Sequence, residues 1–295
     1  MSSRLAQAAV RAAHTPRAFV RAFLFAAFAA LLAASIASPV QAINISASSS
    51  GYGLFVDFNA LNTFNLDAGP LPVGVSGVAP APYADAGTVL NVSISSNVPL
   101  LAEGDVTAAS VSATAASNVD GALGSRITSA SGGIVDGGVD VVTLPIAGPG
   151  VNLLGLDATL SSTAQISGDF GSLAAVGTTT IQDLDLILNA IPVDLSAYVN
   201  VAVAPNTSVN LAALGILNSS LILNEQIIAG DQSSIVVNAF HLNVNIANSI
   251  VAEIILGHSQ AQMTALPEPS GAALAAIGLL GALRAKRTRG RRHYA

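Results

Sequence analysis

Hydrophobic and polar residues alternate along several stretches in the middle of the chain. The clearest runs are 54–60, 183–189 and 236–246. In 54–60 the apolar residues occupy every second position, with Asp57 and Asn59 between them. In 236–246 the same alternation places Val236 and Asn238 on the face that carries Phe240, with Asn238 as its one polar residue. A two-residue period is typical of strands that bury one face, as in antiparallel sheets.

Glycine and proline divide these runs into separate strands. Weaker alternation at 88–95 and 105–114 predicts further strands. The segment 69–82 holds four prolines and predicts a long surface loop, and 120–125, 131–138 and 147–150 predict shorter breaks. No fixed repeat is visible. The pattern predicts an all-β domain, an antiparallel two-layer β-sandwich, with a β-helix as the alternative.

The first 42 residues have the order of an export signal. Four arginines and no acid precede the apolar run 22–37, and Pro39 follows it. Small residues at Val40 and Ala42 then fit a cleavage site between Ala42 and Ile43. We therefore predict a secretory signal peptide with a helical apolar part over 1–42, an exported domain over 43–265 and a sorting segment over 266–295. An uncleaved membrane anchor is the alternative for the first segment.

The last segment combines three features. Pro267, Glu268 and Pro269 come first, and the apolar stretch 270–283, predicted to be a membrane helix, follows. A basic tail ends the segment. Because charged side chains cross a bilayer at a cost of roughly 2.5–3.5 kcal/mol each, the tail is expected to stay in the cytoplasm. The basic tail consists of Arg284, Lys286, Arg287, Arg289, Arg291 and Arg292.

This order over 266–292 resembles the PEP-CTERM sorting signal of Gram-negative bacteria. The resemblance implies processing by an exosortase, an integral-membrane cysteine transpeptidase that cleaves near the Pro-Glu-Pro motif. The chain would then be a substrate with no catalytic residue of its own in that reaction. It would pass through the inner membrane as an intermediate and end at the cell surface or outside the cell.

The middle of the chain also resembles a known family. The segments 50–87, 117–126, 165–171, 222–227 and 255–265 look like the choice-of-anchor P family, whose domains occur with alternative C-terminal anchors. This resemblance implies an exported, surface-associated domain and assigns no activity. PEP-CTERM systems accompany exopolysaccharide production, so the resemblance also implies a role in biofilm or cell-surface architecture.

The distribution of charge supports an extracellular domain. The chain has 11 Lys+Arg and 17 Asp+Glu, but only Arg126 among the cations lies between residues 43 and 265. Sixteen acids lie there, so this part carries a net charge of −15. An acidic domain does not fit nucleic-acid binding. The absence of cysteine excludes disulfides and thiolate metal sites.

The candidate chemistry of the middle is sparse. His241 and His258 are its two histidines, no G-x-S-x-G motif accompanies them, and zinc lacks a third ligand at suitable spacing. We expect no cofactor, with calcium as a weak possibility because hard cations prefer oxygen ligands near turns. The weak calcium candidates are Asp136, Asp140, Asp183 and Asp185, and two further acids near a turn are Glu103 and Asp105.

Aromatic residues suggest a second kind of site. Sugar rings stack on aromatic side chains, and Tyr52 with Phe55, or Tyr83 in the proline-rich segment, would provide such a surface if exposed. The sequence thus predicts a non-enzymatic surface or matrix protein. A glycan- or calcium-binding module is the alternative, and a hydrolase using carboxylates is a minor one.

Overall fold

The computed structural model describes residues 42–60, 63–122, 124–143, 150–169, 171–246 and 250–267. Residues Ala42–Leu266 form one compact unit. The predicted signal segment before Ala42 and the sorting motif, apolar stretch and basic tail from Glu268 onward lie outside the described residues. Within the described ranges, no helix has the length and apolar character needed to cross a membrane.

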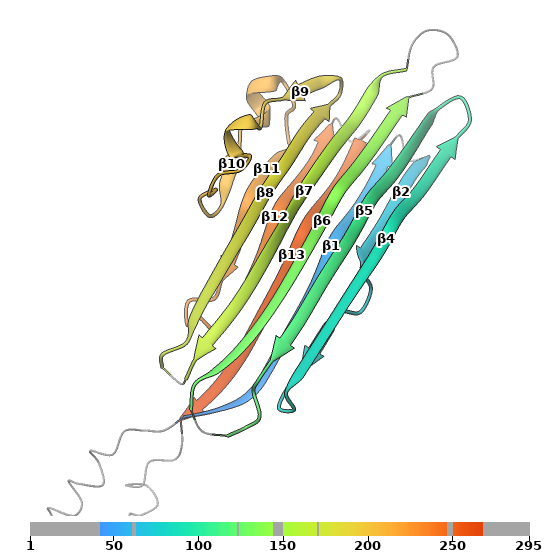
Figure 1. The fold of residues 1–295 in the computed structure, drawn as a ribbon. Helices are drawn as coiled ribbons and strands as arrows, with labels where there is room; N and C mark the ends of the chain where they lie inside the picture. Colours follow the sequence, from blue (N-terminus) through green and yellow to red (C-terminus); the bar gives the residue numbers. More distant parts are fainter. Residues whose placement is uncertain are drawn as a thin grey trace, which may run out of the picture. The chain divides into compact units, whose positions relative to one another are not determined.

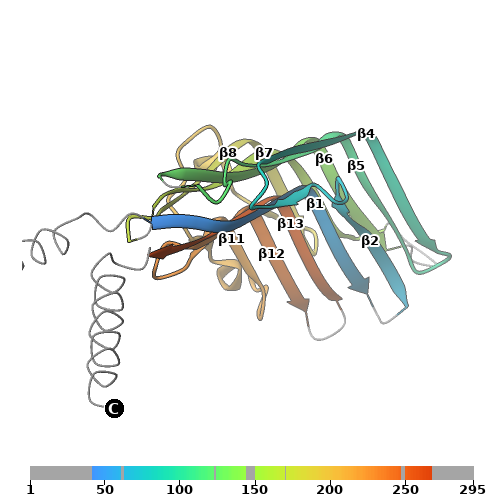
Figure 2. The same cartoon turned by 90° about the horizontal axis from the view of Figure 1, so that it is seen from below.

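The unit is built from two antiparallel sheets packed face to face as a sandwich (Figures 1 and 2). The first sheet has the order β10-β11-β12-β13-β1-β2, with β3 also pairing with β1. The second sheet is the meander β4-β5-β6-β7-β8-β9. The strands of the first sheet are β1 (Ala42–Ala60), β2 (Phe64–Leu71), β3 (Ser76–Val78), β10 (Thr207–Val209), β11 (Ser220–Ile228), β12 (Ser234–Ile246) and β13 (Ile250–Pro267). The strands of the second sheet are β4 (Tyr83–Val98), β5 (Ala102–Ser117), β6 (Arg126–Thr143), β7 (Asn152–Gly168), β8 (Ala174–Leu188) and β9 (Ile191–Val193).

The start of β1 and the end of β13 lie together at one end of the sandwich (Figure 1). The two strands are neighbours in the first sheet, so the chain enters and leaves the fold side by side. A connecting segment between β9 and β11 carries the 3-10 helices η1 (Ser196–Tyr198) and η2 (Leu211–Leu214). Leu195, Leu211 and Ile216 of this segment are buried in the main core, so it fills one side of the sandwich.

The described interior has two main hydrophobic cores, and a small third cluster is formed by Val75, Ala113 and Ala115. The larger one is built from bulky residues such as Phe58, Phe64 and Phe240. The smaller one is rich in alanine and valine and includes Ile166 and Met263. Between them Ser162 and Ser259 meet across the two sheets, with their hydroxyl oxygens 2.8 Å apart.

Glycines bring the two sheets into direct backbone contact in this central region. A β-carbon on Gly132 of β6 would overlap the carbonyl oxygens of Tyr52 on β1 and His258 on β13. A β-carbon on Gly51 would overlap the carbonyl oxygen of Ser131, and one on Gly53 that of Gly133. We call these positions, Gly51, Gly53 and Gly132, the glycine contact. Only residues without a side chain let two sheets approach this closely.

Along most long strands the residues that face the interior switch once between odd-numbered and even-numbered positions. We call this switch the phase change, and it lies at the same level as the glycine contact. In the first sheet two consecutive residues are buried, and in the second sheet two consecutive residues point outward. Neighbouring strands that change phase together stay in register. Strand β7 has no phase change and pairs with β6 and β8 through register shifts, which are typical of β-bulges. The inward pairs are Gly53–Leu54, Leu223–Asn224, Ala239–Phe240 and Leu256–Gly257, and the outward pairs are Leu90–Asn91, Ala109–Ser110, Val135–Asp136 and Gln182–Asp183.

The two-layer sandwich predicted from the alternation is confirmed for the described residues, and they do not form the alternative β-helix. Residues 54–60 bury Leu54, Val56, Phe58 and Ala60 as predicted. The expected break at 131–138 is wrong, because these residues lie inside β6, where the glycines allow the sheets to touch. The loop expected at 69–82 is interrupted by β3 and includes the end of β2.

Asn238 is explained by the phase change. It precedes the inward pair Ala239–Phe240, so Val237 and Phe240 point inward while Asn238 points outward with Val236. The placement of Val236 on the face of Phe240 was therefore wrong, since the alternation does not continue unbroken through β12.

Replacing Gly132 with alanine should lower the free energy of unfolding by about 3 kcal/mol or more, because the added methyl group forces two backbones apart. Gly230→Ala is the matched control, since a β-carbon there meets no atom within 4 Å. Urea unfolding of both variants measures the difference. Equal stability of the two variants would contradict a backbone contact at Gly132.

Candidate functional site

The outer face of the first sheet carries a hydrogen-bonded group of polar side chains that we call the polar relay. Its members come from four adjacent strands, β1, β13, β12 and β11. Register places Glu225 opposite Asn238, and Asn238 opposite His258. The polar relay consists of Tyr52, Glu225, Asn238, His241, Glu253 and His258.

Asn238 lies at the centre of the polar relay. Its Nδ2 donates to Glu225 Oε2 over 2.6 Å, and its Oδ1 lies 2.6 Å from His258 Nδ1. Because a carboxylate accepts only, the amide nitrogen must face Glu225, and the amide oxygen is left to accept from His258. This contact therefore fixes the proton of His258 on Nδ1.

His241 joins the two glutamates. Its Nδ1 lies 2.8 Å from Glu225 Oε2, and its Nε2 lies 3.3 Å from Glu253 Oε1. The second contact is close enough for an ion pair but lacks hydrogen-bond geometry, so Nε2 is buried without a hydrogen-bond partner. The His241 ring is therefore held by a hydrogen bond at Nδ1 only.

Tyr52 covers the other end of the polar relay. Its ring stacks on that of His258 with centroids 4.3 Å apart and an angle of 13° between the planes. Burial, followed by the nearby Glu253 charge, raises the pKa of Tyr52 to about 12. Burial also lowers the pKa of His258 to about 4, against the smaller opposing influence of Glu225. The stacked pair is therefore neutral near pH 7.

The polar relay does not provide a nucleophile for the histidines. In the sequence Gly257-His258-Ser259 the two polar side chains point to opposite faces of the sheet. Ser259 is fully buried between the sheets and bonded to Ser162, whereas His258 faces outward. Both candidate histidines are thus hydrogen-bonded members of one polar network.

A shallow hollow lies beside the polar relay on the outer face of β1 and β2. Its polar members are Asp57, Asn59, Asn65 and Asp67, and Phe55 forms one side. Asp57 lies directly opposite Asp67 in the β1–β2 ladder, and Asn59 Nδ2 donates to Asn65 Oδ1 over 2.5 Å. Phe55 is half-buried, as is Tyr52, whose centroid lies 6.4 Å away. This hollow combines an apolar ring edge with groups that bind hydroxyls.

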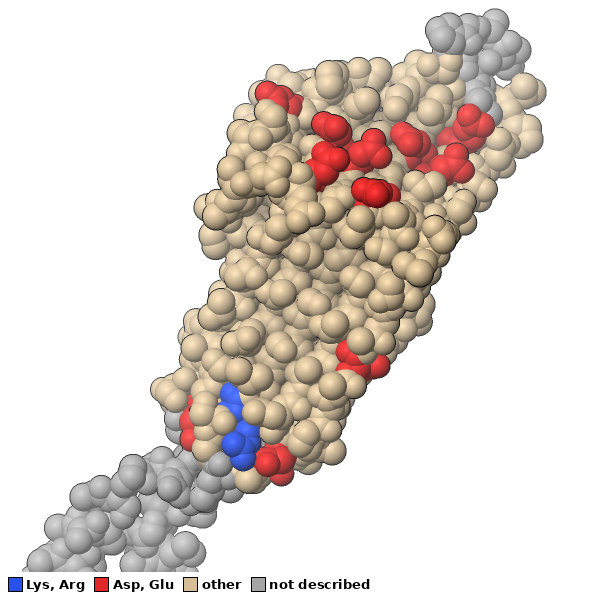
Figure 3. Space-filling model, viewed as in Figure 1, with Lys and Arg blue, Asp and Glu red and all other residues tan. Residues whose placement is uncertain are grey.

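The outer face of the second sheet carries a row of acids across four adjacent strands (Figure 3). Asp105 lies opposite Asp140, and Asp157 lies opposite Asp185. Asp140 and Asp157 are diagonal neighbours in the β6–β7 ladder. We call Asp105, Asp140, Asp157 and Asp185 the acidic row. Burial first, and then the charges of Asp157 and Asp105, raise the pKa of Asp140.

The structure brings together some of the weak calcium candidates. Asp140 and Asp185 both belong to the acidic row, whereas Asp136 lies at the phase change, where Thr159 bonds to its backbone and side chain. Among the described residues, no group of three or more histidine, aspartate or glutamate side chains is arranged to hold a metal ion. Asp157 was missed in the sequence, although its position between Leu156 and Ala158 follows the same alternation.

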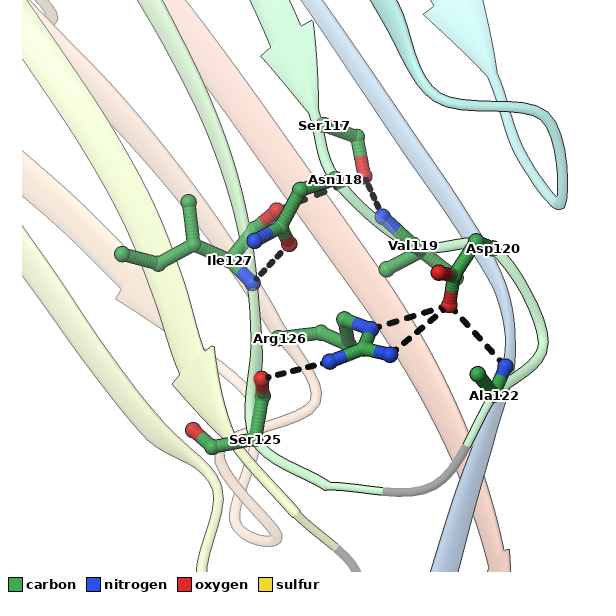
Figure 4. A network of polar contacts seen from close by, with 8 residues as sticks. All are labelled: Ser117, Asn118, Val119, Asp120, Ala122, Ser125, Arg126 and Ile127. Carbon is green, nitrogen blue, oxygen red and sulfur yellow. Dashed lines mark hydrogen bonds and ion pairs between the residues drawn. The ribbon is translucent and has the colours of Figure 1, made fainter.

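Arg126 and Asp120 fasten the β5–β6 turn (Figure 4). Asp120 Oδ1 accepts from Arg126 Nε at 3.0 Å, lies 2.9 Å from Arg126 Nη2, and accepts from the Ala122 amide at 2.9 Å. The Ala122 bond, followed by that of Arg126, lowers the pKa of Asp120. Asn118 closes the turn through its bonds to Ile127. The conspicuous SNVDGALGSR segment thus has a structural role in this turn.

A hollow of about 600 Å³ lies at the β7–β8 and β11–β12 turns beside the last residues of β13. Asp231 is the titratable residue among those that line it, and Ser233 already donates to that carboxylate. It therefore offers no pair of groups for acid–base chemistry.

Comparisons of the chain with protein-family models, curated protein sequences and solved structures found no match.

Acid should destabilise the fold through His258. The unfolded side chain binds a proton below about pH 6.5, whereas the folded one does so only near pH 4. Stability is therefore unaffected above about pH 6.5 and falls between pH 6.5 and 4, by at most about 3 kcal/mol. His258→Gln should flatten this part of the profile in urea unfolding. An unchanged slope in that variant would contradict the assignment.

Neutralising the acidic row should stabilise the sheet. Asp140→Asn removes like-charge repulsion with two neighbours and should raise the free energy of unfolding by roughly 0.5 kcal/mol at low salt and by less at high salt. Calcium and magnesium at equal concentration should raise the melting midpoint equally. A larger shift with calcium would instead reveal a specific calcium site.

Proposed function

We propose that this protein is an exported surface or extracellular-matrix protein of a Gram-negative bacterium with a structural or interaction role. Signal peptidase would remove residues 1–42, and an exosortase would process the segment that begins near Pro267. The mature part would then remain at the cell surface or be released into extracellular material. An association with exopolysaccharide or biofilm follows from the resemblance of the sorting segment.

One observation of the fold supports this proposal most directly. The first and last strands are neighbours, and both reach the same end of the sandwich, while the acidic row lies toward the other end (Figures 1 and 3). A domain connected through one end can present the rest of its surface. The acidic face also suits an aqueous exterior, because like charge resists self-association and precipitation.

The described side chains add little support for catalysis. The two histidines lie in the polar relay without a nucleophile, and the acids of the acidic row lie on an open sheet face. We therefore propose a non-enzymatic role over that of a hydrolase.

A glycan-binding module is the second candidate. The observation in its favour is the hollow beside Phe55, where carboxylates and amides flank an aromatic ring. Such groups are suited to sugar hydroxyls and to the apolar face of a sugar ring. A glycan array separates the two candidates, because only the second requires binding that depends on Phe55.

Deleting 270–292 should release or misroute the protein, because the apolar stretch and the basic tail would hold the sorting intermediate in the membrane. Intact mass of the mature wild-type form should show cleavage after Ala42 and the loss of the basic tail. A control in which the six cations become serine keeps the apolar stretch and tests the tail alone. Mature protein that retains the arginines would overturn exosortase processing.

A further inference from the structure

Strand β4 is an open edge of the second sheet (Figure 1). It is 16 residues long and pairs with β5 along one side. Within the described ranges, no other strand or side chain bonds to its outer edge between Thr88 and Asn97. A long free edge exposes a row of unpaired backbone donors and acceptors and is a template for another strand.

The edges of β8 and β11 are covered in part. On β8, strand β9 pairs with Leu186–Leu188, and Asn200 donates to the carbonyls of Ile181 and Gln182. On β11, strand β10 pairs with Leu221–Leu223, and Asn206 bonds to the backbone of Gln226. Strand β2, the edge of the first sheet, also pairs on one side only, but at eight residues it is half as long as β4.

Apolar side chains gather along the same edge. The four most exposed large hydrophobic residues of the described chain are Val73 at 78%, Val78 at 75%, Leu100 at 70% and Leu90 at 65%. They belong to β4, to the turn that follows it, and to the 72–79 segment that packs against the first half of β4. Between Ala86 and Val98 the strand has no charged residue. A neutral edge with exposed aliphatic groups favours association.

The phase change of β4 determines which partner fits. Before it, the positions that face inward are odd-numbered, such as Gly87 and Val89, and after it they are even-numbered, such as Val92 and Ile94. A partner strand with unbroken alternation would match both halves of β4 only through a register shift, as β7 does against β6. Neighbours inside the sheet solve this by having a phase change at the same level, as β5 does.

A second copy of β4 supplies that match around the midpoint of the strand. The change falls between Leu90 and Asn91, at the midpoint of Tyr83–Val98. A two-fold axis there pairs residues 88–93 of the two copies antiparallel, with Val89 opposite Val92, so that inward residues meet inward residues. Outward residues also meet, with Thr88 opposite Ser93 and Leu90 opposite Asn91. Facing residues in antiparallel strands must share a face, and this register satisfies that rule at each of these positions.

Charge also favours the antiparallel arrangement. Asp105 and Glu103 lie on β5, one strand away from the edge and near one end of it. In parallel copies Asp105 and Glu103 would lie about 14 Å from their counterparts, with both β4 strands between them. The acid of β4 itself, Asp85, would face Asp85 of the other copy directly. Antiparallel copies place Asp85 toward Ser96 instead and so avoid this repulsion. We propose that β4 is the site at which two copies of this chain join edge to edge, antiparallel, into one continuous sheet.

Cysteine cross-linking tests the register, because the chain has no cysteine of its own. In the full chain purified in mild detergent, the double variant Thr88→Cys/Ser93→Cys should form disulfide-linked dimers under mild oxidation. Position 88 of one copy then faces position 93 of the other, within the reach of a disulfide. Each single variant is a matched control and should stay monomeric on a denaturing gel. Both positions are exposed, so a thermal melt checks that folding is unchanged.

Each other outcome overturns the proposal. Equal cross-linking of the Thr88→Cys variant alone would indicate parallel or random encounters. A monomeric wild-type chain in sedimentation equilibrium, together with no cross-link in the double variant, would show that β4 does not pair with itself. As a second measurement, Leu90→Lys should weaken dimerisation roughly tenfold, and mixing it with Leu90→Glu should restore it. Failure of the mixture to associate would also contradict a junction at Leu90.

Discussion

The fold depends on the direct contact between the backbones of its two sheets. Face-to-face sheets usually lie about 10 Å apart with side chains between them, but the glycine contact leaves no room for side chains there. The contact divides the interior into a core of large residues and a core of small ones. It also coincides with the phase change, which lets each half of a strand present its own apolar face inward. Separating the two backbones at Gly132 would therefore disturb both cores.

The polar relay is a consequence of the same contact. The carbonyl oxygens of Tyr52 and His258 face Gly132, and their side chains stack on the opposite, outer face of the sheet. Next to them the phase change turns Asn238 outward, where it bonds to His258 and Glu225. A polar group that looks misplaced in the sequence is thus satisfied on the outer face. The neutral His258 and Tyr52 of the polar relay suit a structural role, in which side chains link four adjacent strands.

The sequence predicted the class of fold because one-faced strands leave a two-residue pattern, as at 54–60 and in the leucines of β8. It did not predict the continuity of β6, since glycines that permit sheet contact look the same as glycines in turns. It also could not place Val236, because a phase change alters which residues share a face without changing composition. The acids of the acidic row were partly recognised, but their grouping depends on strand order, which the alternation does not encode.

The position of β13 has a mechanical consequence. This strand carries the last described residues and lies in the interior of its sheet, between β12 and β1. Tension applied along the strand through Pro267 loads the ladders on both sides in shear, so that many hydrogen bonds must break together. A terminal strand at a sheet edge would instead peel away one bond at a time. If flowing liquid pulls the domain by this end, the domain would resist unfolding until the hydrogen bonds along the whole of β13 break together.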